Sequence, residues 1–203
     1  NVITGTKSSS GDTIIFKPTG PLTTTDMSYY TATIKAVDPP DLWRIEKELP
    51  VTEGQLISVA VSENGNLFLG GDSFLACYDE SLSSKWKIIM PGKIGALSVY
   101  GDTVYAASGE LLFLVDSDGR MIAEWGPYEA NSIITSVSAG RKYVVFADAG
   151  AKRIFIIRKD GEVISMLGQG NEKFIIPSAY FDVAVTGEDV VFAANTGHRR
   201  IET

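Results

Sequence analysis

Short apolar segments separated by turn residues recur along this chain, and that repetition constrains the fold more than any other feature. Four such segments begin 38, 39 and 47 residues apart: Ile57–Val61, Gly95–Val99, Ile134–Ser138 and Phe181–Val185. Each is followed by a turn that contains glycine and then by a second apolar segment. A regular period of this kind indicates repeated supersecondary units that bury their apolar faces against one another.

Each of the first three units contains four apolar segments, and the last contains two followed by the start of a third. Asp118-Gly119 and Asp160-Gly161 precede the fourth segments of the second and third units. Asp-Gly between apolar segments is a strong hairpin signal, because both turn positions need a positive φ. Four short strands per unit predict an all-β fold, a β-propeller with about four blades, the last of which lacks its fourth strand.

The N-terminal residues differ in character from the repeats. Residues 1–30 are rich in Ser and Thr and predict a flexible segment with one strand, Asp12–Phe16. Blades are expected over residues 31–203, beginning with a strand at Tyr29–Ala36 and with Trp43-Arg44-Ile45 as the outer strand of an earlier blade. A polar tether before a β domain, on a chain that begins with Asn1, favours an exported protein. A linker within a larger intracellular protein is the alternative.

The last two units carry the sharpest motif. Ala147–Ile154 (ADAGAKRI) aligns without gaps with Ala194–Ile201 (ANTGHRRI). Both resemble the core of NHL repeats, whereas the first two units have Gly70-Gly71 and Ala107-Ser108 at the Ala-Asp position. The resemblance implies an NHL-type propeller of six or so blades. We therefore expect either further blades beyond Thr203, or self-association or a partner chain at the edge of the last blade, because an unpaired strand edge favours association.

The composition excludes several kinds of chemistry. The chain has 18 Lys and Arg against 25 Asp and Glu, a net charge of −7, which does not favour general nucleic-acid binding. One cysteine, Cys77, and one histidine, His198, exclude a zinc site of paired thiolates or several imidazoles. Cys77 aligns with Leu114 and Ile156 and is expected in the core. No apolar run approaches the ~18–20 residues of a membrane span.

Enzymes that resemble this architecture include hydrolases and lyases with calcium or histidine-bound zinc near the propeller axis. The alternative function is a divergent calcium-dependent hydrolase or lyase, with Asp148, Asn195 and Asp182 as candidate ligands, because calcium needs several converging oxygen atoms. In the favoured interpretation, Asp148 and Asn195 cap turns and no cofactor is bound.

The favoured function is a non-catalytic interaction or scaffold module with a protein partner. Recognition concentrates on loops of a rigid scaffold, and the apolar loop before the last unit supplies candidate contacts. These contacts are Phe174, Ile175, Ile176 and Tyr180, to which the equivalent basic residues Arg153 and Arg200 are added. RNA binding through such basic residues is a further alternative, but acidic residues are interleaved with them.

Overall fold

A computed structural model describes residues 5–10, 13–18, 34–35, 46–170, 174–177 and 180–203. The chain divides into two compact units, Asn1–Glu48 and Leu49–Thr203, hereafter units 1 and 2. The predicted strand at Trp43-Arg44-Ile45 lies outside the described residues, as does most of the one at Tyr29–Ala36. The predicted boundary after residue 30 stays a prediction.

Unit 1 contains a small antiparallel sheet in the order β1-β2-β3, formed by Gly5–Ser10, Thr13–Pro18 and Ile34–Lys35. The strand expected at Asp12–Phe16 corresponds to β2. The sequence interpretation did not anticipate β1, which lies within the segment expected to be flexible. Strands pair through backbone groups, so a polar sequence does not prevent a segment from joining a sheet.

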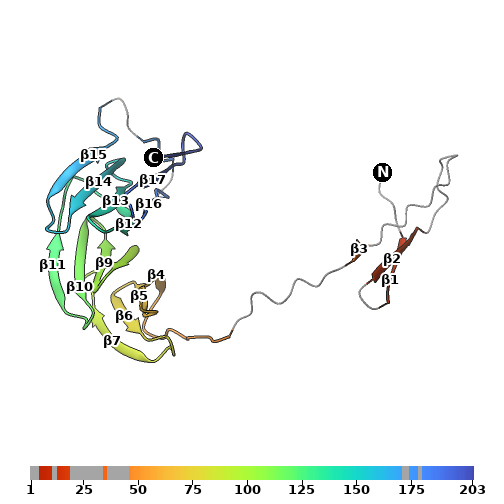
Figure 1. Ribbon diagram of the computed structural model, residues 1–203. Helices are drawn as coiled ribbons and strands as arrows, with labels where there is room; N and C mark the ends of the chain where they lie inside the picture. Colours follow the sequence, from red (N-terminus) through yellow and green to blue (C-terminus); the bar gives the residue numbers. More distant parts are fainter. Residues whose placement is uncertain (1–4, 11–12, 19–33, 36–45, 171–173, 178–179) are drawn as a thin grey trace. The chain divides into compact units, whose positions relative to one another are not determined.

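Within its described residues, unit 2 consists of four antiparallel sheets, which follow one another along the chain (Figure 1). The first contains β4 (Leu56–Val61), β5 (Leu67–Gly71), β6 (Phe74–Tyr78) and β7 (Ser84–Ile89). The second contains β8 (Ala96–Tyr100), β9 (Thr103–Ser108), β10 (Leu111–Asp116) and β11 (Met121–Trp125). The third contains β12 (Ile134–Ala139), β13 (Tyr143–Asp148), β14 (Arg153–Arg158) and β15 (Val163–Leu167). The fourth contains β16 (Val183–Val185), β17 (Val191–Asn195) and β18 (Arg200–Glu202).

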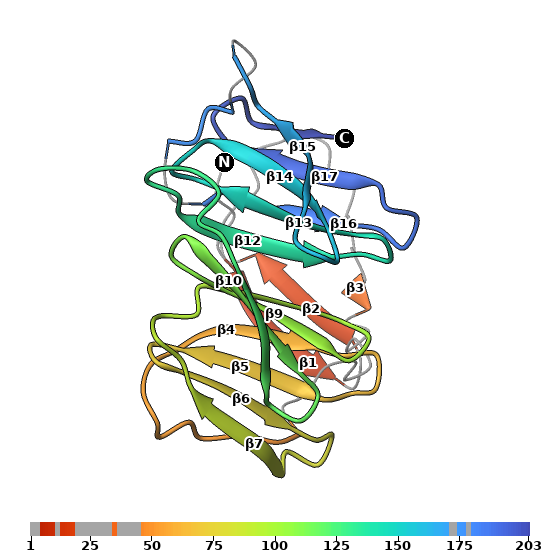
Figure 2. The same cartoon turned by 90° about the vertical axis from the view of Figure 1, so that its left-hand side faces the viewer.

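Each sheet is a meander whose strands pair in chain order, and the first strands of successive sheets lie side by side. In Figure 1, β7, β11 and β15 lie along the opposite edge of the unit. Figure 2 shows β4 to β7 at one end of the series and β15 to β17 toward the other. These sheets are propeller blades, numbered here 1 to 4, and the predicted all-β propeller fold is confirmed. Among the described residues, no helix is long and apolar enough to cross a membrane.

The hydrophobic core lies between consecutive blades. One cluster joins blades 1 and 2 and includes Leu75 and Phe113; a second joins blades 2 and 3 and includes Leu112 and Phe146. A third joins blades 3 and 4 and includes Ile154 with residues of the connecting segment. Blades 1 to 3 therefore each have a back face that packs on the next blade, and blades 2 to 4 each have a front face that packs on the preceding one.

Backbone register identifies equivalent positions in the four blades. On the back faces, Leu75, Leu112, Ile154 and Ile201 are equivalent, because each pairs with the same position of the preceding strand. On the front faces, Val59, Leu97, Val137 and Val183 are equivalent for the same reason. These equivalences allow the environment of a residue in one blade to be compared directly with that of its counterparts.

Candidate functional site

Asp148, the first candidate calcium ligand, lies buried at the end of β13, and both of its carboxyl oxygens are bonded to protein donors. Oδ1 accepts hydrogen bonds from the backbone N–H groups of Ile133 and Ala151, each at 2.9 Å. Oδ2 accepts a hydrogen bond from the Ser132 hydroxyl. Asp148 therefore caps the turn after β13 through Ala151, as the turn-capping interpretation expects. Its bonds from Ser132 and Ile133 also connect this turn to the segment before β12.

Asn195 occupies the position equivalent to Asp148 on β17. Its Nδ2 donates a hydrogen bond to Oε1 of Glu202 at 2.8 Å and lies 3.2 Å from Nδ1 of His198. Its Oδ1 is buried and has no hydrogen-bond partner among the described residues. The bond from Asn195 and the charge of Arg200 lower the pKa of Glu202, although burial opposes this shift. The side chain of Asn195 therefore forms its hydrogen bond of 2.8 Å with Glu202 on β18, rather than with a backbone group of the turn that follows β17.

A cavity of about 660 Å³ lies beside Asn195, between β15 and the strands β17 and β18. In blade 3 the equivalent space holds the stacked rings of Phe146 and Phe155, whose centroids are 4.9 Å apart. Blade 4 has Ala193 and Glu202 at those positions, so the space is left open. Its polar lining residues are Gln169, Asn195, His198, Arg200, Glu202 and Thr203.

Asp182, the third candidate ligand, is exposed just before β16, where its backbone carbonyl accepts a hydrogen bond from Ala194 N–H at 2.9 Å. In the described part of the chain, no group of three or more His, Cys, Asp or Glu side chains is placed to hold a metal ion. Within those residues, Asp182 and Asp148 therefore do not belong to a cluster of metal-binding side chains.

The predicted contact loop divides into buried and exposed residues. Phe174 is only 4% exposed and packs on Phe181, with ring centroids 4.9 Å apart, so it belongs to the core between blades 3 and 4. Ile176 is partly buried against the same cluster. Ile175 and Tyr180 are exposed and are accessible to a partner.

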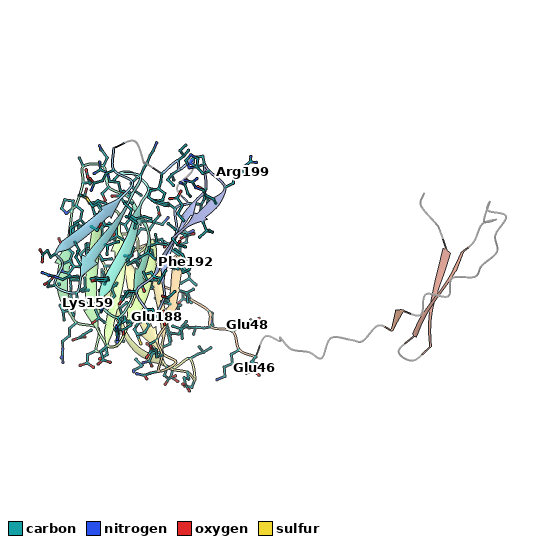
Figure 3. All side chains as sticks on the ribbon, turned by 45° about the horizontal axis from the view of Figure 1, so that its top comes forward. Glu46, Glu48, Lys159, Glu188, Phe192 and Arg199 are labelled. Atoms are coloured by element: carbon teal, nitrogen blue, oxygen red, sulfur yellow. The ribbon has the colours of Figure 1, made fainter. Side chains whose placement is uncertain are left out.

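The two basic residues named as candidate contacts, Arg153 and Arg200, have acidic partners within the chain. Arg153 forms an ion pair with Glu129, and Arg200 lies 2.8 Å from Oε1 of Glu202. Lys159, labelled in Figure 3, has its Nζ 4.3 Å from the centroid of the Tyr100 ring, and burial lowers its pKa. The carboxylates of Glu129 and Glu202 offset part of the positive charge that Arg153 and Arg200 would offer to a phosphate.

The back face of blade 4 carries the largest departure from the repeat. Leu75, Leu112 and Ile154 are each fully buried by the next blade, but the equivalent Ile201 is 63% exposed. Phe192, labelled in Figure 3, is exposed in the same way, although its counterparts in blades 1 to 3 are buried. Within the described residues, no blade covers this face, which is called the back end face below.

The front face of blade 1 also exposes apolar side chains whose counterparts in other blades are buried. Val59 and Val61 are 60% and 63% exposed, whereas the equivalents of Val59 in blades 3 and 4, Val137 and Val183, are 6% and 8% exposed. The outer part of this face is covered by Leu49 and Val51, which pack against a small cluster that contains Tyr78. The exposed inner part, with Val59 and Val61, is called the front end face below.

Sequence reasoning did not single out these end-face residues. Val59, Val61, Phe192 and Ile201 belong to the same alternating pattern as their buried counterparts, so their local sequence carries no signal of exposure. The signal lies in their position in the first and last described blades, which alignment of the repeats would have identified.

The folded unit defines a class of protein, an all-β protein with β-propeller blades. In particular it resembles virginiamycin B lyase from Staphylococcus aureus: a selenomethionine-substituted form is 15% identical and matches with a TM-score of 0.62 over 77% of this chain and 58% of that one. A catalytically inactive form with quinupristin is 13% identical, with a TM-score of 0.61 over 76% and 53%. This chain therefore spans a little over half the length of those lyases.

Other solved propellers match at similar levels. The WD40 domain of Neurospora crassa Pan2 is 13% identical, with a TM-score of 0.54 over 69% of this chain and 43% of that one. No protein-family model matches the chain, so the likeness to NHL repeats stays a resemblance. No curated protein matches it in sequence. At identities this low, the structural matches show the fold alone.

Proposed function

We propose that unit 2 is a non-catalytic interaction module that binds protein partners through its two end faces. The observation that carries the proposal is Ile201, which is 63% exposed at a position where three counterparts are fully buried. An apolar side chain gains roughly 25 cal/mol for each Å² removed from water, so covering this face favours association. Val59, Val61 and Phe192 add to the apolar area in the same way.

The scaffold suits this role because the blades hold each other rigidly. The three clusters between blades contain many fully buried side chains, and hydrogen bonds also join the first strands of blades 2, 3 and 4. A rigid surface binds a partner with little loss of conformational entropy. Exposed apolar patches with polar surroundings mark interaction sites on soluble proteins.

The chemistry of the end faces also defines the kind of partner. Each face is one half of the packing surface that joins consecutive blades in this chain. The partner must therefore present an apolar sheet surface of complementary shape, rather than an extended charged segment or a small polar ligand.

Photo-crosslinking tests the proposal in cells that express the full chain. A benzophenone amino acid replaces Ile201 in one variant, Val61 in a second and Ile122 in a control. Ile122 is 55% exposed on β11, outside both end faces. We expect adducts with protein at positions 201 and 61 and none at position 122. Absence of adducts at both end faces, or equal yields at all three positions, would overturn the proposed function.

A further inference from the structure

The two end faces correspond to the two sides of the interface between consecutive blades, which limits the kinds of partner that fit them. The back end face is equivalent to the back faces of blades 1 to 3, each of which packs on the front face of the blade that follows. The front end face is equivalent to those front faces. One chain thus displays both halves of an interface that it already forms three times internally within its described residues.

We infer that the back end face of one copy binds the front end face of a second copy, so that two copies close head to tail into one propeller. This inference rests on the proposed function and names its partner. An interface between two different patches closes into a ring when its rotation permits. Two copies supply twice the four sheets described here, which agrees with the range of about four to eight blades in propellers.

Hydrogen bonds between the first strands of neighbouring blades provide an independent argument. Ser136 Oγ accepts a hydrogen bond from the backbone N–H of Val183 at 3.2 Å across the interface between blades 3 and 4. Asp182 stands at the position of Ser136 in blade 4, and Val59 stands at the position of Val183 in blade 1. In the assembly, the carboxyl group of Asp182 accepts the N–H of Val59 from the second copy.

The connecting segments agree with this arrangement. Met90 and Ile94, in the segment between blades 1 and 2, are buried in the cluster that joins those blades. Leu49 and Val51, in the segment before blade 1, pack on the front face of that blade in a similar manner. The front face of blade 1 therefore already carries the connecting residues that elsewhere lie between two blades.

The oligomeric state of the purified 203-residue chain tests the inference by light scattering after size exclusion. We expect a mass about twice the 21.9 kDa of one copy. Val61→Glu and Ile201→Lys each place a charge on one end face. Each variant, measured alone, is therefore expected to be a monomer with the mass of one copy. Ile122→Lys, at a position of similar exposure outside the end faces, is expected to keep the mass of two copies.

Mixing the two end-face variants separates a head-to-tail interface from a symmetric one. In a mixed pair, the unmodified Ile201 of one copy meets the unmodified Val61 of the other, so we expect the equimolar mixture to regain the mass of two copies. A variant whose far-UV circular dichroism differs from that of the parent chain is replaced by Ile201→Ser or Val61→Ser. Asp182→Ala is expected to raise the dissociation constant roughly tenfold or more, and Asp182→Asn to recover part of that loss.

Three outcomes would overturn the inference: a parent chain with the mass of one copy, a mass that grows with concentration beyond two copies, or sensitivity of only one end face to substitution. These outcomes are distinct from failure of the proposed function. Crosslinks from positions 61 and 201 to a different protein, together with a purified chain of 21.9 kDa, would preserve the interaction module and reject the second copy.

Discussion

Trp86 of blade 1 lies directly against Gly119 of blade 2: a Cβ atom added to Gly119 would be 2.8 Å from Cδ2 of the indole ring. The indole Nε1 donates a hydrogen bond to the carbonyl of Ser117 in the same turn, at 2.7 Å. Blades 2 and 3 repeat the contact, since a Cβ atom on Gly161 would be 2.8 Å from Nε1 of Trp125. The tryptophan of one blade thus packs on the Asp-Gly turn of the next.

This contact predicts that Gly119→Ala destabilises unit 2 for two reasons. Gly119 has φ +82°, a conformation that costs an alanine roughly 1–2 kcal/mol. The clash with Trp86 adds about 1–3 kcal/mol by overpacking. Denaturant unfolding measures the loss. Gly101→Ala is the matched control, because Gly101 also has a positive φ, +57°, but nothing lies within 4 Å of its added Cβ. Equal losses for the two variants would contradict the packing argument.

Asp148 and its counterpart Asn195 are expected to respond differently to truncation. Asp148→Ala removes the acceptor of three hydrogen bonds and leaves one buried donor, the Ser132 hydroxyl, and two partly buried backbone N–H groups unpaired, which is expected to cost more than about 2 kcal/mol of unfolding free energy. Asn195→Ala is expected to cost less, because it also removes a buried oxygen that has no partner within the described residues. Thermal and denaturant unfolding of both variants provide the comparison. A larger loss for Asn195→Ala would show that its bond to Glu202 dominates.

Chelation of divalent cations is expected to leave the thermal midpoint of the protein unchanged. The calcium hypothesis assigned Asp148 as a ligand, but its two carboxyl oxygens already accept hydrogen bonds from protein donors. Differential scanning calorimetry with and without EDTA measures the effect, and elemental analysis of the purified protein accompanies it. A midpoint lowered by EDTA and restored by added calcium would revive the hypothesis.

The thiol of Cys77 is expected to resist alkylation in the folded protein. Cys77 is fully buried on β6, and burial raises the pKa of its thiol, so less of the reactive thiolate forms at any pH below that value. Iodoacetamide labelling followed by mass spectrometry measures the rate, which is expected to rise by orders of magnitude in denaturant. Labelling of the native chain as fast as that of the unfolded chain would contradict the burial of this residue.

The strand pattern could be predicted because its signals are local. Three predicted segments, Ile57–Val61, Gly95–Val99 and Ile134–Ser138, match β4, β8 and β12 to within one residue at each end. Asp-Gly turns and short apolar runs fix such boundaries through backbone preferences that act within a few residues. The succession of blades followed from their period along the sequence.

Burial on the blade faces could not be predicted in the same way, because it depends on contacts distant in sequence. Ile154 and Ile201 each follow a pair of basic residues, Lys152-Arg153 and Arg199-Arg200, yet one isoleucine is fully buried and the other is 63% exposed. Phe174 was a candidate contact residue because its loop is apolar, but Phe181 and the blade interface bury it. The identity of the partner, the export of the protein and its blade number stay predictions.

The packing of three core clusters between consecutive blades also determines the order in which the blades are expected to unfold. Blades 2 and 3 are each supported by described neighbours on both sides, whereas blades 1 and 4 are supported on one. In a nearest-neighbour array, a unit held on one side detaches first. A single copy of the chain should therefore lose amide protection progressively from β4 and β18 inward, and the slowest hydrogen–deuterium exchange should fall in the strands from β9 to β14.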